Sequence, residues 1–137
     1  MSTDACLKME SVKKTEVLKK WQLHLEQVRK QSEALSMELL WQVLCELQQV
    51  TFHTVKGIPF TYGIRGYEMF VDRKEKSITQ ATVLLSAQRV LEKQHQGIAI
   101  TGTKKIGTFG ASYLSPIFQH IGLILSEYIP IYMNVIL

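Results

Sequence analysis

Between about Leu7 and Val50, hydrophobic residues recur every three or four positions in a stretch without glycine or proline. This spacing places them along one side of a helix. The apolar stripe consists of Leu18, Trp21, Leu25, Val28, Leu35 and Leu39. It predicts one long helix, or two helices that meet near Gln31 and Ser32. The stripe either packs on the rest of its own chain or forms a coiled-coil or helical-hairpin interface between two copies.

After Val50 the pattern changes to short runs of β-branched and aromatic residues. The runs 50–55, 58–64 and 67–71 are separated by Lys56-Gly57 and Arg65-Gly66, which predicts an antiparallel three-stranded meander. Two-residue turns would pair Val55 with Ile58 and Ile64 with Tyr67. The core face would then carry Val55, Ile58, Phe60, Tyr62, Ile64, Tyr67, Met69 and Val71, with His53 among them. The more polar face would carry Phe52, Thr54, Thr61, Gly63, Arg65, Glu68, Phe70 and Asp72.

Further signals predict the rest of the fold. Ser77 and Gln80 have capping-box spacing, so we expect a helix over 78–94 that lies across the sheet with Ile78, Ala81, Leu84, Leu85 and Leu91 facing inwards. A short fourth strand at 98–101, a glycine-punctuated loop at 102–110 and a C-terminal helix beginning near Ser112 or Ser115-Pro116 would follow. The predicted fold is α+β: a long N-terminal helical region, a three- to four-stranded antiparallel meander, a helix across it and a C-terminal helix.

Charge divides the chain near Val50. The 137 residues, at 46% hydrophobic and 20% charged, suffice for about one ordinary globular domain and exclude a disordered or collagen-like chain. The first fifty residues hold seven basic and seven acidic side chains, whereas the remainder holds nine and five, so the net charge of +4 lies there. We therefore interpret 1–50 as a helical, oligomerising region and 51–137 as a basic α+β domain suited to a polyanionic partner.

The titratable residues form no cluster that predicts catalysis. His24, His53, His95 and His120 are scattered without metal-ligand spacing, so we expect no metal, no cofactor and no catalytic residue. Cys6 and Cys45 have no CxxC partner and no secretory leader precedes them, which predicts reduced thiols and a cytoplasmic protein. The apolar stretch 117–137 is too often interrupted by polar residues to predict a membrane span.

The basic residues after Val50 predict a nucleic-acid interface. The loop GTKKIGTFG lacks the Gly-Lys-Ser/Thr order of a P-loop, but its lysines could contact phosphates. In layout, the segment 51–94 is similar to the arm-binding domains of tyrosine recombinases and the plant ethylene-response domain, whose sheets enter the major groove. The nominated residues are Lys56, Arg65, Arg73, Lys74, Lys76, Lys104 and Lys105. Glu68 and Asp72 on the same face oppose this interpretation, and Phe52 and Phe70 suggest a protein-contact patch instead.

The runs GYEMFVDRKEKSITQATV (66–83) and KKIGTFGASYLSPIF (104–118) carry a resemblance. They are similar to small proteins of gut Clostridia and related Firmicutes that have no assigned activity. The resemblance covers about 51–123 and implies a bacterial source linked to a phage or mobile element. It transfers no catalytic residue.

Three functional hypotheses follow. The first is a non-enzymatic, dimeric accessory or regulatory protein that binds DNA or RNA through the basic residues. The second is a protein-interaction module, or an inhibitor encoded by a phage or mobile element, that binds its partner through Phe52 and Phe70. The third is a small ligand-binding domain or enzyme with a pocket around His53 and Tyr62.

Overall fold

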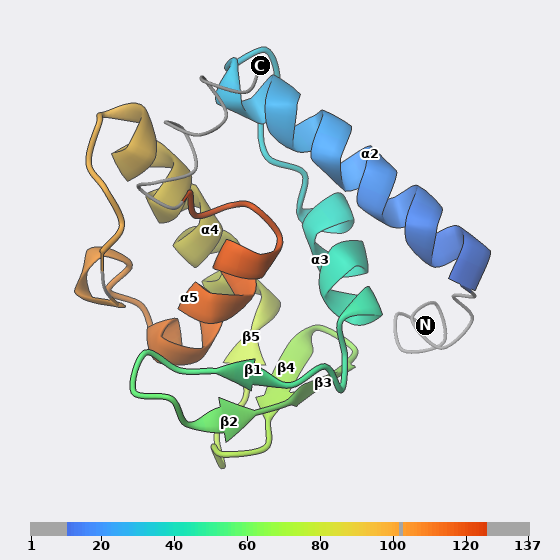
Figure 1. Ribbon diagram of the computed structural model, residues 1–137, viewed down its shortest axis with the longest axis vertical. Coiled ribbons are helices and arrows are strands. Elements are labelled where there is room, and N and C mark those ends of the chain that lie inside the picture. Colours follow the sequence, from blue (N-terminus) through green and yellow to red (C-terminus); the bar gives the residue numbers. More distant parts are fainter. Residues whose placement is uncertain (1–10, 102, 126–137) are drawn as a thin grey trace.

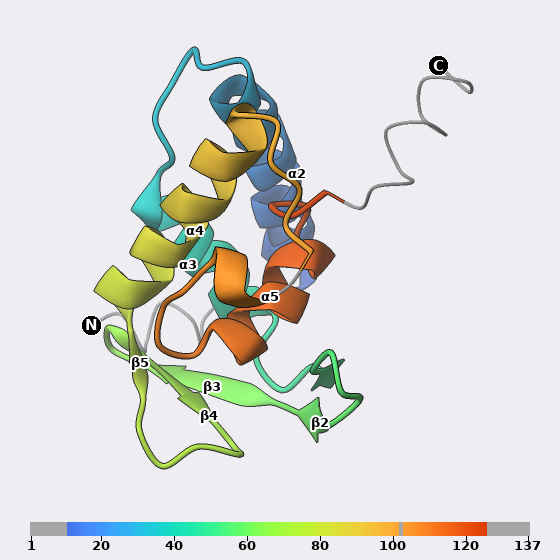
Figure 2. The same cartoon turned by 90° about the vertical axis from the view of Figure 1, so that its left-hand side faces the viewer.

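The computed structural model describes residues 11–101 and 103–125. Its helices within these ranges are α2 (Ser11–Arg29), α3 (Met37–Glu46), α4 (Gln80–His95), α5 (Ala111–His120) and the short 3-10 helix η1 (Thr103–Lys105). Its strands are β1 (Phe52–His53), β2 (Pro59–Phe60), β3 (Tyr62–Arg65), β4 (Glu68–Val71) and β5 (Ile78–Thr79). Figures 1 and 2 show the strands at one end of the molecule, with the helices packed above them. The predicted α+β class is confirmed.

The N-terminal stripe is divided between two helices, because α2 ends at Arg29. Gln31 has a φ of 61°, in the left-handed region that usually requires glycine. The N–H of Gln31 donates to the carbonyl of Val28, and that of Ser32 to the carbonyl of Gln27, at 3.0 and 2.9 Å. These two bonds form a Schellman motif, so the helix ends without the glycine by which a sequence usually signals such an end.

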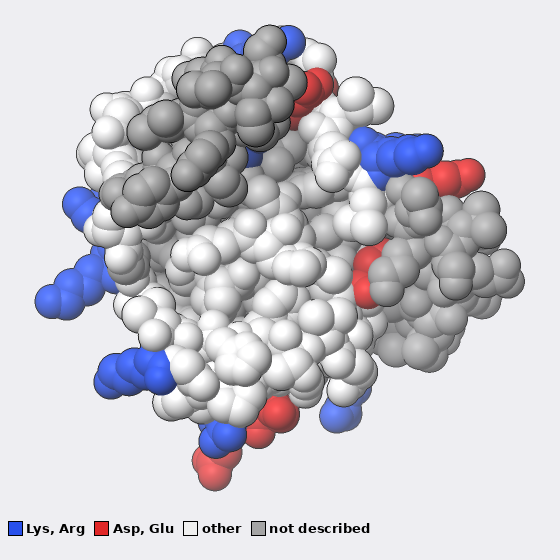
Figure 3. All heavy atoms as spheres, viewed as in Figure 1, with Lys and Arg blue, Asp and Glu red and all other residues white. Residues whose placement is uncertain are grey.

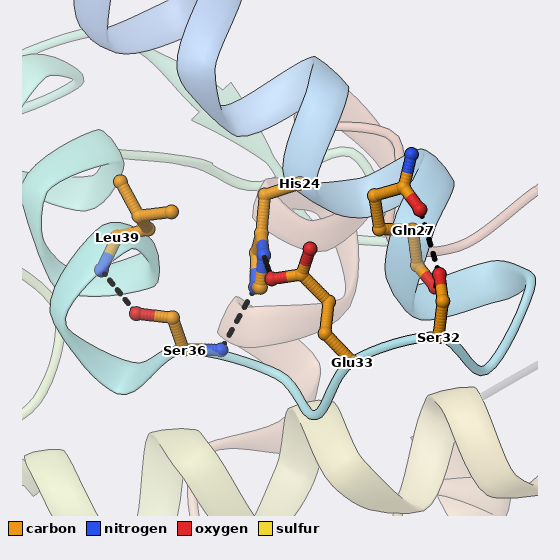
Figure 4. A network of polar contacts seen from close by, with 6 residues as sticks. All are labelled: His24, Gln27, Ser32, Glu33, Ser36 and Leu39. Atoms are coloured by element: carbon orange, nitrogen blue, oxygen red, sulfur yellow. Dashed lines mark hydrogen bonds and ion pairs between the residues drawn. The ribbon is translucent and has the colours of Figure 1, made fainter.

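The connection between α2 and α3 is held by the polar network of Figure 4. Ser36 caps α3, since its hydroxyl accepts a hydrogen bond from the N–H of Leu39 at 3.2 Å. The N–H of Ser36 donates to Nε2 of His24 at 2.9 Å, and Nδ1 of His24 lies 2.7 Å from a carboxylate oxygen of Glu33. His24 is buried, so it fixes the first turn of α3 against α2 from within the protein.

β1 and β2 form a two-stranded sheet whose register differs from the prediction by one residue. Phe52 pairs with Phe60 and His53 with Pro59. The turn has three residues rather than two, with Gly57 at a φ of 85°, and the N–H of Thr54 donates to the carbonyl of Ile58. A one-residue shift exchanges the two faces of a strand. The prediction that Phe52 lies on the outer face is therefore wrong: Phe52 is 6% exposed, whereas Val55, expected in the core, is 78% exposed.

β3, β4 and β5 form a separate sheet in that order. The expected continuous strand 58–64 is interrupted at Thr61, whose N–H donates to the carboxylate of Asp72. The tight turn is Gly66-Tyr67 rather than Arg65-Gly66, which pairs Ile64 with Met69. This shift of two residues preserves the faces, so the β3 and β4 residues expected in the core are buried: Tyr62, Ile64, Met69 and Val71. Tyr67 lies in the turn and is exposed, contrary to expectation.

α4 begins two residues later than predicted, whereas α5 begins near Ser112, at the first of its two predicted starts. Thr79, not Ser77, caps α4, because Ile78 and Thr79 extend the sheet as β5. The buried face of α4 is therefore Val83, Ser86, Ala87 and Val90, and Leu85, expected to face inwards, is 44% exposed. Segment 98–101, expected as a strand, is irregular. α5 begins at Ala111, after Gly110 with a φ of 81°, and contains Pro116.

One hydrophobic core extends from Val17 in α2 to Ile124 after α5, so the two regions defined by composition share it. Trp21 is 1% exposed and its indole N–H donates to the carbonyl of Ile121 at 2.8 Å. Leu25 is also buried, while Leu18, Leu35 and Leu39 are partly buried against the core and Val28 is half-buried. The centre of the nominated oligomer interface is thus occupied by the chain's own packing.

Two further predictions concern the cysteines and the membrane. Cys45 is disulfide-bonded, so the expectation of a reduced thiol is wrong at this residue. Cys6 and the apolar run 129–137 lie outside the described residues. Across the described part of the chain, none of the helices is long and apolar enough to cross a membrane.

Candidate nucleic-acid interface

A groove of about 670 Å³ opens between the β1–β2 turn, η1 and the start of α5. Its walls carry three of the nominated lysines, five hydroxyl groups and two apolar side chains. The lining residues are Thr54, Val55, Lys56, Ile58, Thr101, Thr103, Lys104, Lys105, Ser112 and Tyr113. We call this the Tyr113 groove. Because no carboxylate is among these lining residues, the groove favours an anionic ligand over a cationic one.

The one-residue shift in the β1–β2 sheet shapes one wall of the groove. The wider turn directs Val55 and Lys56 outwards, and Ile58 is 42% exposed beside them. Two hydrogen bonds between Thr54 and Ile58, at 3.0 and 3.1 Å, close the hairpin next to its turn. Val55 and Ile58, which were expected in the core, thus belong to an exposed surface.

The other wall is η1, which Ile106 anchors in the core at 1% exposure. The N–H groups of Ile106 and Gly107 both donate to the carbonyl of Thr103, which closes the turn that carries Lys104 and Lys105. Arg89 of α4 donates to the carbonyl of Ile106 at 3.1 Å. These contacts hold the backbone under the two lysines while their side chains remain exposed.

A second cluster adjoins the groove through Tyr113. The ammonium nitrogen of Lys74 lies 4.4 Å from the ring centroid of Phe109 and 5.8 Å from that of Tyr113. The ammonium of Lys76 lies 5.8 Å from the Phe109 ring. Phe109 is 43% exposed, and we call these three residues, Lys74, Lys76 and Phe109, the Phe109 patch. Cation–π contacts of this kind place two positive charges beside an exposed aromatic ring.

Arg73 and Arg65 complete the nominated set. Arg73 donates from Nε to the carbonyl of Pro59 at 2.9 Å, which places it at the base of the hairpin that forms the groove. Arg65 lies elsewhere, at the β3–β4 turn beside α3, with its guanidinium 4.9 Å from the ring of Phe70 and with Glu68 as its cross-strand partner. The structure thus brings together six of the seven nominated residues and leaves out Arg65.

Acidic side chains near these six cations are few. Asp72 and Glu75 belong to the same β4–β5 connection as Lys74, and Asp72 accepts hydrogen bonds from the backbone and hydroxyl of Thr61. Figure 3 shows basic side chains spaced along the edge of the molecule over η1 and the β1–β2 turn, with acidic ones beside basic ones at the lower edge. Glu68 is a third carboxylate close to this set, because it accepts a hydrogen bond at 2.5 Å from the hydroxyl of Ser77, the neighbour of Lys76. Among the described residues, six cations thus stand against three nearby carboxylates, and the net charge of the set is positive.

The other predicted sites are not assembled. Phe52 is buried against the rings of Phe60, Tyr62 and His120, while Phe70 is half-buried on the outer face of the other sheet. These two phenylalanines therefore do not form one exposed patch. His53 is exposed, whereas Tyr62 is 1% exposed and donates its hydroxyl to the carbonyl of Leu44.

No metal site is evident in the part of the chain that the structure describes, where no group of three or more candidate ligands occurs. Among the described residues, the aromatic members of the interface were missed by the sequence argument. Phe109 and Tyr113 follow Lys104 and Lys105 within a few positions, and this alternation of basic and aromatic residues was the available signal.

Comparison with known proteins adds no assignment: no protein-family model, no curated protein and no solved structure matches this chain.

Proposed function

We propose that this protein is a non-enzymatic accessory or regulatory protein that binds nucleic acid through the Tyr113 groove and the Phe109 patch. The observation that carries the proposal is the groove itself, whose described lining residues include three lysines and no carboxylate. The proposal replaces the outer face of the sheet with the groove as the binding surface. Glu68, which faced the ligand under the original hypothesis, is not among the residues that line the groove; it pairs with Arg65 across the sheet and lies beside Ser77 at the edge of the Phe109 patch.

The chemistry of the lining fits a phosphate backbone. Lysine ammonium groups neutralise phosphates, and hydroxyls such as those of Thr103 and Ser112 can donate hydrogen bonds to phosphate oxygens. Binding releases the counterions of each neutralised phosphate, so affinity falls as salt rises. If all six clustered cations contact phosphates, the logarithm of the affinity should fall against the logarithm of salt concentration with a slope of about four to five.

Dimerisation is not required by this proposal. Trp21 and Leu25, at the centre of the expected interface, are buried within one chain. A dimer would therefore have to use another surface, and the groove is formed by residues of a single chain.

The test is a titration of a fluorescently labelled oligonucleotide, followed by anisotropy at several salt concentrations. The double variant Lys104→Ala/Lys105→Ala should lose most of the affinity and reduce the salt slope by about two. The matched control is Lys19→Ala/Lys20→Ala, which removes an adjacent, exposed lysine pair from α2. Absence of binding at low salt, or an equal loss in both double variants, would contradict the proposal.

A protein partner is the second candidate, and the exposure of Val55 and Ile58 on the walls of the groove favours it. Apolar side chains of this kind fit a partner segment that combines acidic with hydrophobic residues. Under this alternative, Val55→Ser/Ile58→Ser would abolish a partner complex, while the affinity for oligonucleotides would be low and would not depend on Lys104 and Lys105.

A further inference from the structure

The nominated interface is not only basic but also apolar. Seven large hydrophobic side chains in the described part of the chain are conspicuously exposed, and three of them, Val55, Ile58 and Phe109, belong to the Tyr113 groove or the Phe109 patch. Phosphates are bound by charged and hydrogen-bonding groups, so exposed apolar side chains would contribute nothing to a surface that binds only phosphates. Their position among six cations therefore indicates a ligand that presents apolar surfaces as well as phosphates.

We propose, on the basis of the proposed function, that the ligand is single-stranded nucleic acid and that Phe109 stacks against one of its bases. Unpaired bases offer flat apolar faces, which stack on aromatic side chains while a basic groove follows the backbone. In a duplex these faces are hidden in the base stack, and the outer surface presents phosphates and sugars. Exposed apolar residues beside lysines thus match a single strand better than a duplex.

The shape of the site supports the same ligand. Proteins usually read a duplex with a helix or a two-stranded ribbon that projects into the major groove. Here the lysines lie on the walls of a concavity instead, with Lys56 on the hairpin side and Lys104 and Lys105 on the η1 side. A single strand can lie between these two walls and place its phosphates near lysines of both.

Lys74 connects the groove to the stacking residue. Its ammonium group lies within 6 Å of both the Tyr113 ring, which lines the groove, and the Phe109 ring. A strand that leaves the groove past Tyr113 therefore meets Lys74 next and Phe109 beyond it. Phe109 offers the base its exposed ring surface, while Lys74 and Lys76 contact the phosphates on either side.

Phe109 is also held in place. The preceding residue, Thr108, has its hydroxyl 2.5 Å from that of Ser86 in α4. The following residue, Gly110, leads directly into α5. A ring on a backbone fixed at both sides loses little conformational freedom on stacking, which favours its use as a platform.

The experiment compares three probes by anisotropy or competition: single-stranded dT12, the same strand paired with dA12, and inorganic polyphosphate. The wild-type protein should prefer the single strand. Phe109→Leu should weaken binding of dT12 by about five- to 150-fold, as expected for the loss of one stacked base, and leave polyphosphate binding unchanged. Phe109→Tyr should retain the affinity because it keeps the ring. Phe70→Leu is the matched control, since Phe70 also lies under a cation but belongs to neither the Tyr113 groove nor the Phe109 patch.

The outcomes separate the two proposals. Equal binding of duplex and single strand, together with an unchanged affinity in Phe109→Leu, would overturn the single-strand inference and leave the proposed function standing. If none of the nucleic acids binds at low salt, both proposals fail. Circular dichroism of each variant establishes that it is folded, and loss of binding in Phe109→Tyr as well as Phe109→Leu would count against stacking.

Discussion

The backbone N–H of Ser36 donates a hydrogen bond to Nε2 of His24 at 2.9 Å, twelve residues earlier in the chain. Because Nε2 accepts this bond, it carries no proton, and the neutral ring must carry its proton on Nδ1, which faces the carboxylate of Glu33 at 2.7 Å. The His24 side chain thus accepts the N–H of Ser36, the residue that caps α3, and this hydrogen bond determines which ring nitrogen carries the proton.

His24→Ala should destabilise the protein by about 1–3 kcal/mol, because it leaves the N–H of Ser36 without its acceptor in a partly buried place. Glu33→Ala should cost less, since the Glu33 side chain is 48% exposed and water can replace it. Denaturant unfolding of both variants measures the difference. Nitrogen chemical shifts of the His24 ring test the tautomer, and a proton on Nε2 would contradict the assignment.

Gly110→Ala should be among the more damaging small substitutions in this chain. A Cβ atom at this position would lie 2.4 Å from Cδ1 and 2.8 Å from Cγ1 of Ile78, which is fully buried, and the φ of 81° already disfavours alanine. We expect a loss of about 2–4 kcal/mol from the overlap and the backbone strain together.

Gly57→Ala is the control for this substitution. Gly57 has a φ of 85°, but nothing lies within 4 Å of an added Cβ. Only the backbone cost of about 1–2 kcal/mol should remain. Thermal or denaturant unfolding of the two variants separates overlap from strain, and equal losses would show that the Ile78 side chain can move aside.

The adjacent residues Gln48 and Gln49 should respond in opposite ways to glycine. Gln49 has a φ of 68°, so Gln49→Gly should stabilise the protein by about 0.5–1 kcal/mol through relief of backbone strain. Gln48→Gly should destabilise it by about 1–3 kcal/mol. The side chain of Gln48 accepts from the N–H of Ile64 at 2.6 Å and donates to the carbonyl of Cys45 at 3.1 Å. Denaturant midpoints decide, and a loss of stability in Gln49→Gly would contradict the strain argument.

The sequence predicts faces well where an error in register leaves them unchanged. In β3 and β4 the pairing differs from the prediction by two residues, and the inward positions of Tyr62 and Met69 remain correct. In β1 the difference is one residue, and Phe52 moves from the outer face to the core. Alternation alone does not distinguish a two-residue from a three-residue turn, so the position of Phe52 was not predictable from it.

For the site, too, the sequence identifies the charged residues but not how they are arranged in space. Composition identifies lysines and arginines, but their grouping depends on contacts between distant segments. Lys56 and Lys104 line the same groove because α5 contacts both β1 and η1. Arg65 lies away from them, next to the turn whose Gly66 carbonyl accepts a hydrogen bond from Trp41 of α3. Local patterns carry no information about these contacts, so the sequence predicts the members of the interface and not its shape.

The buried hydroxyl of Tyr62 should make the free energy of unfolding fall at alkaline pH. Burial raises the pKa of its hydroxyl far above the ordinary value, and the hydroxyl donates to the carbonyl of Leu44 at 2.5 Å. In the unfolded chain the same hydroxyl loses its proton near pH 10. Above that pH the unfolded state therefore binds fewer protons than the folded state, and this one group lowers the free energy of unfolding by about 1.4 kcal/mol per pH unit.

Comparison with Tyr62→Phe isolates this effect from the titration of the lysines. At pH 7 the variant should be less stable than the wild type by about 1 kcal/mol, because it lacks the hydrogen bond to Leu44. Between pH 10 and 11 the difference should shrink and then reverse, since phenylalanine does not titrate. Denaturant unfolding at pH 7, 9, 10 and 11 measures both proteins. A constant difference across that range would show that the Tyr62 hydroxyl ionises in the folded protein as readily as in the unfolded chain.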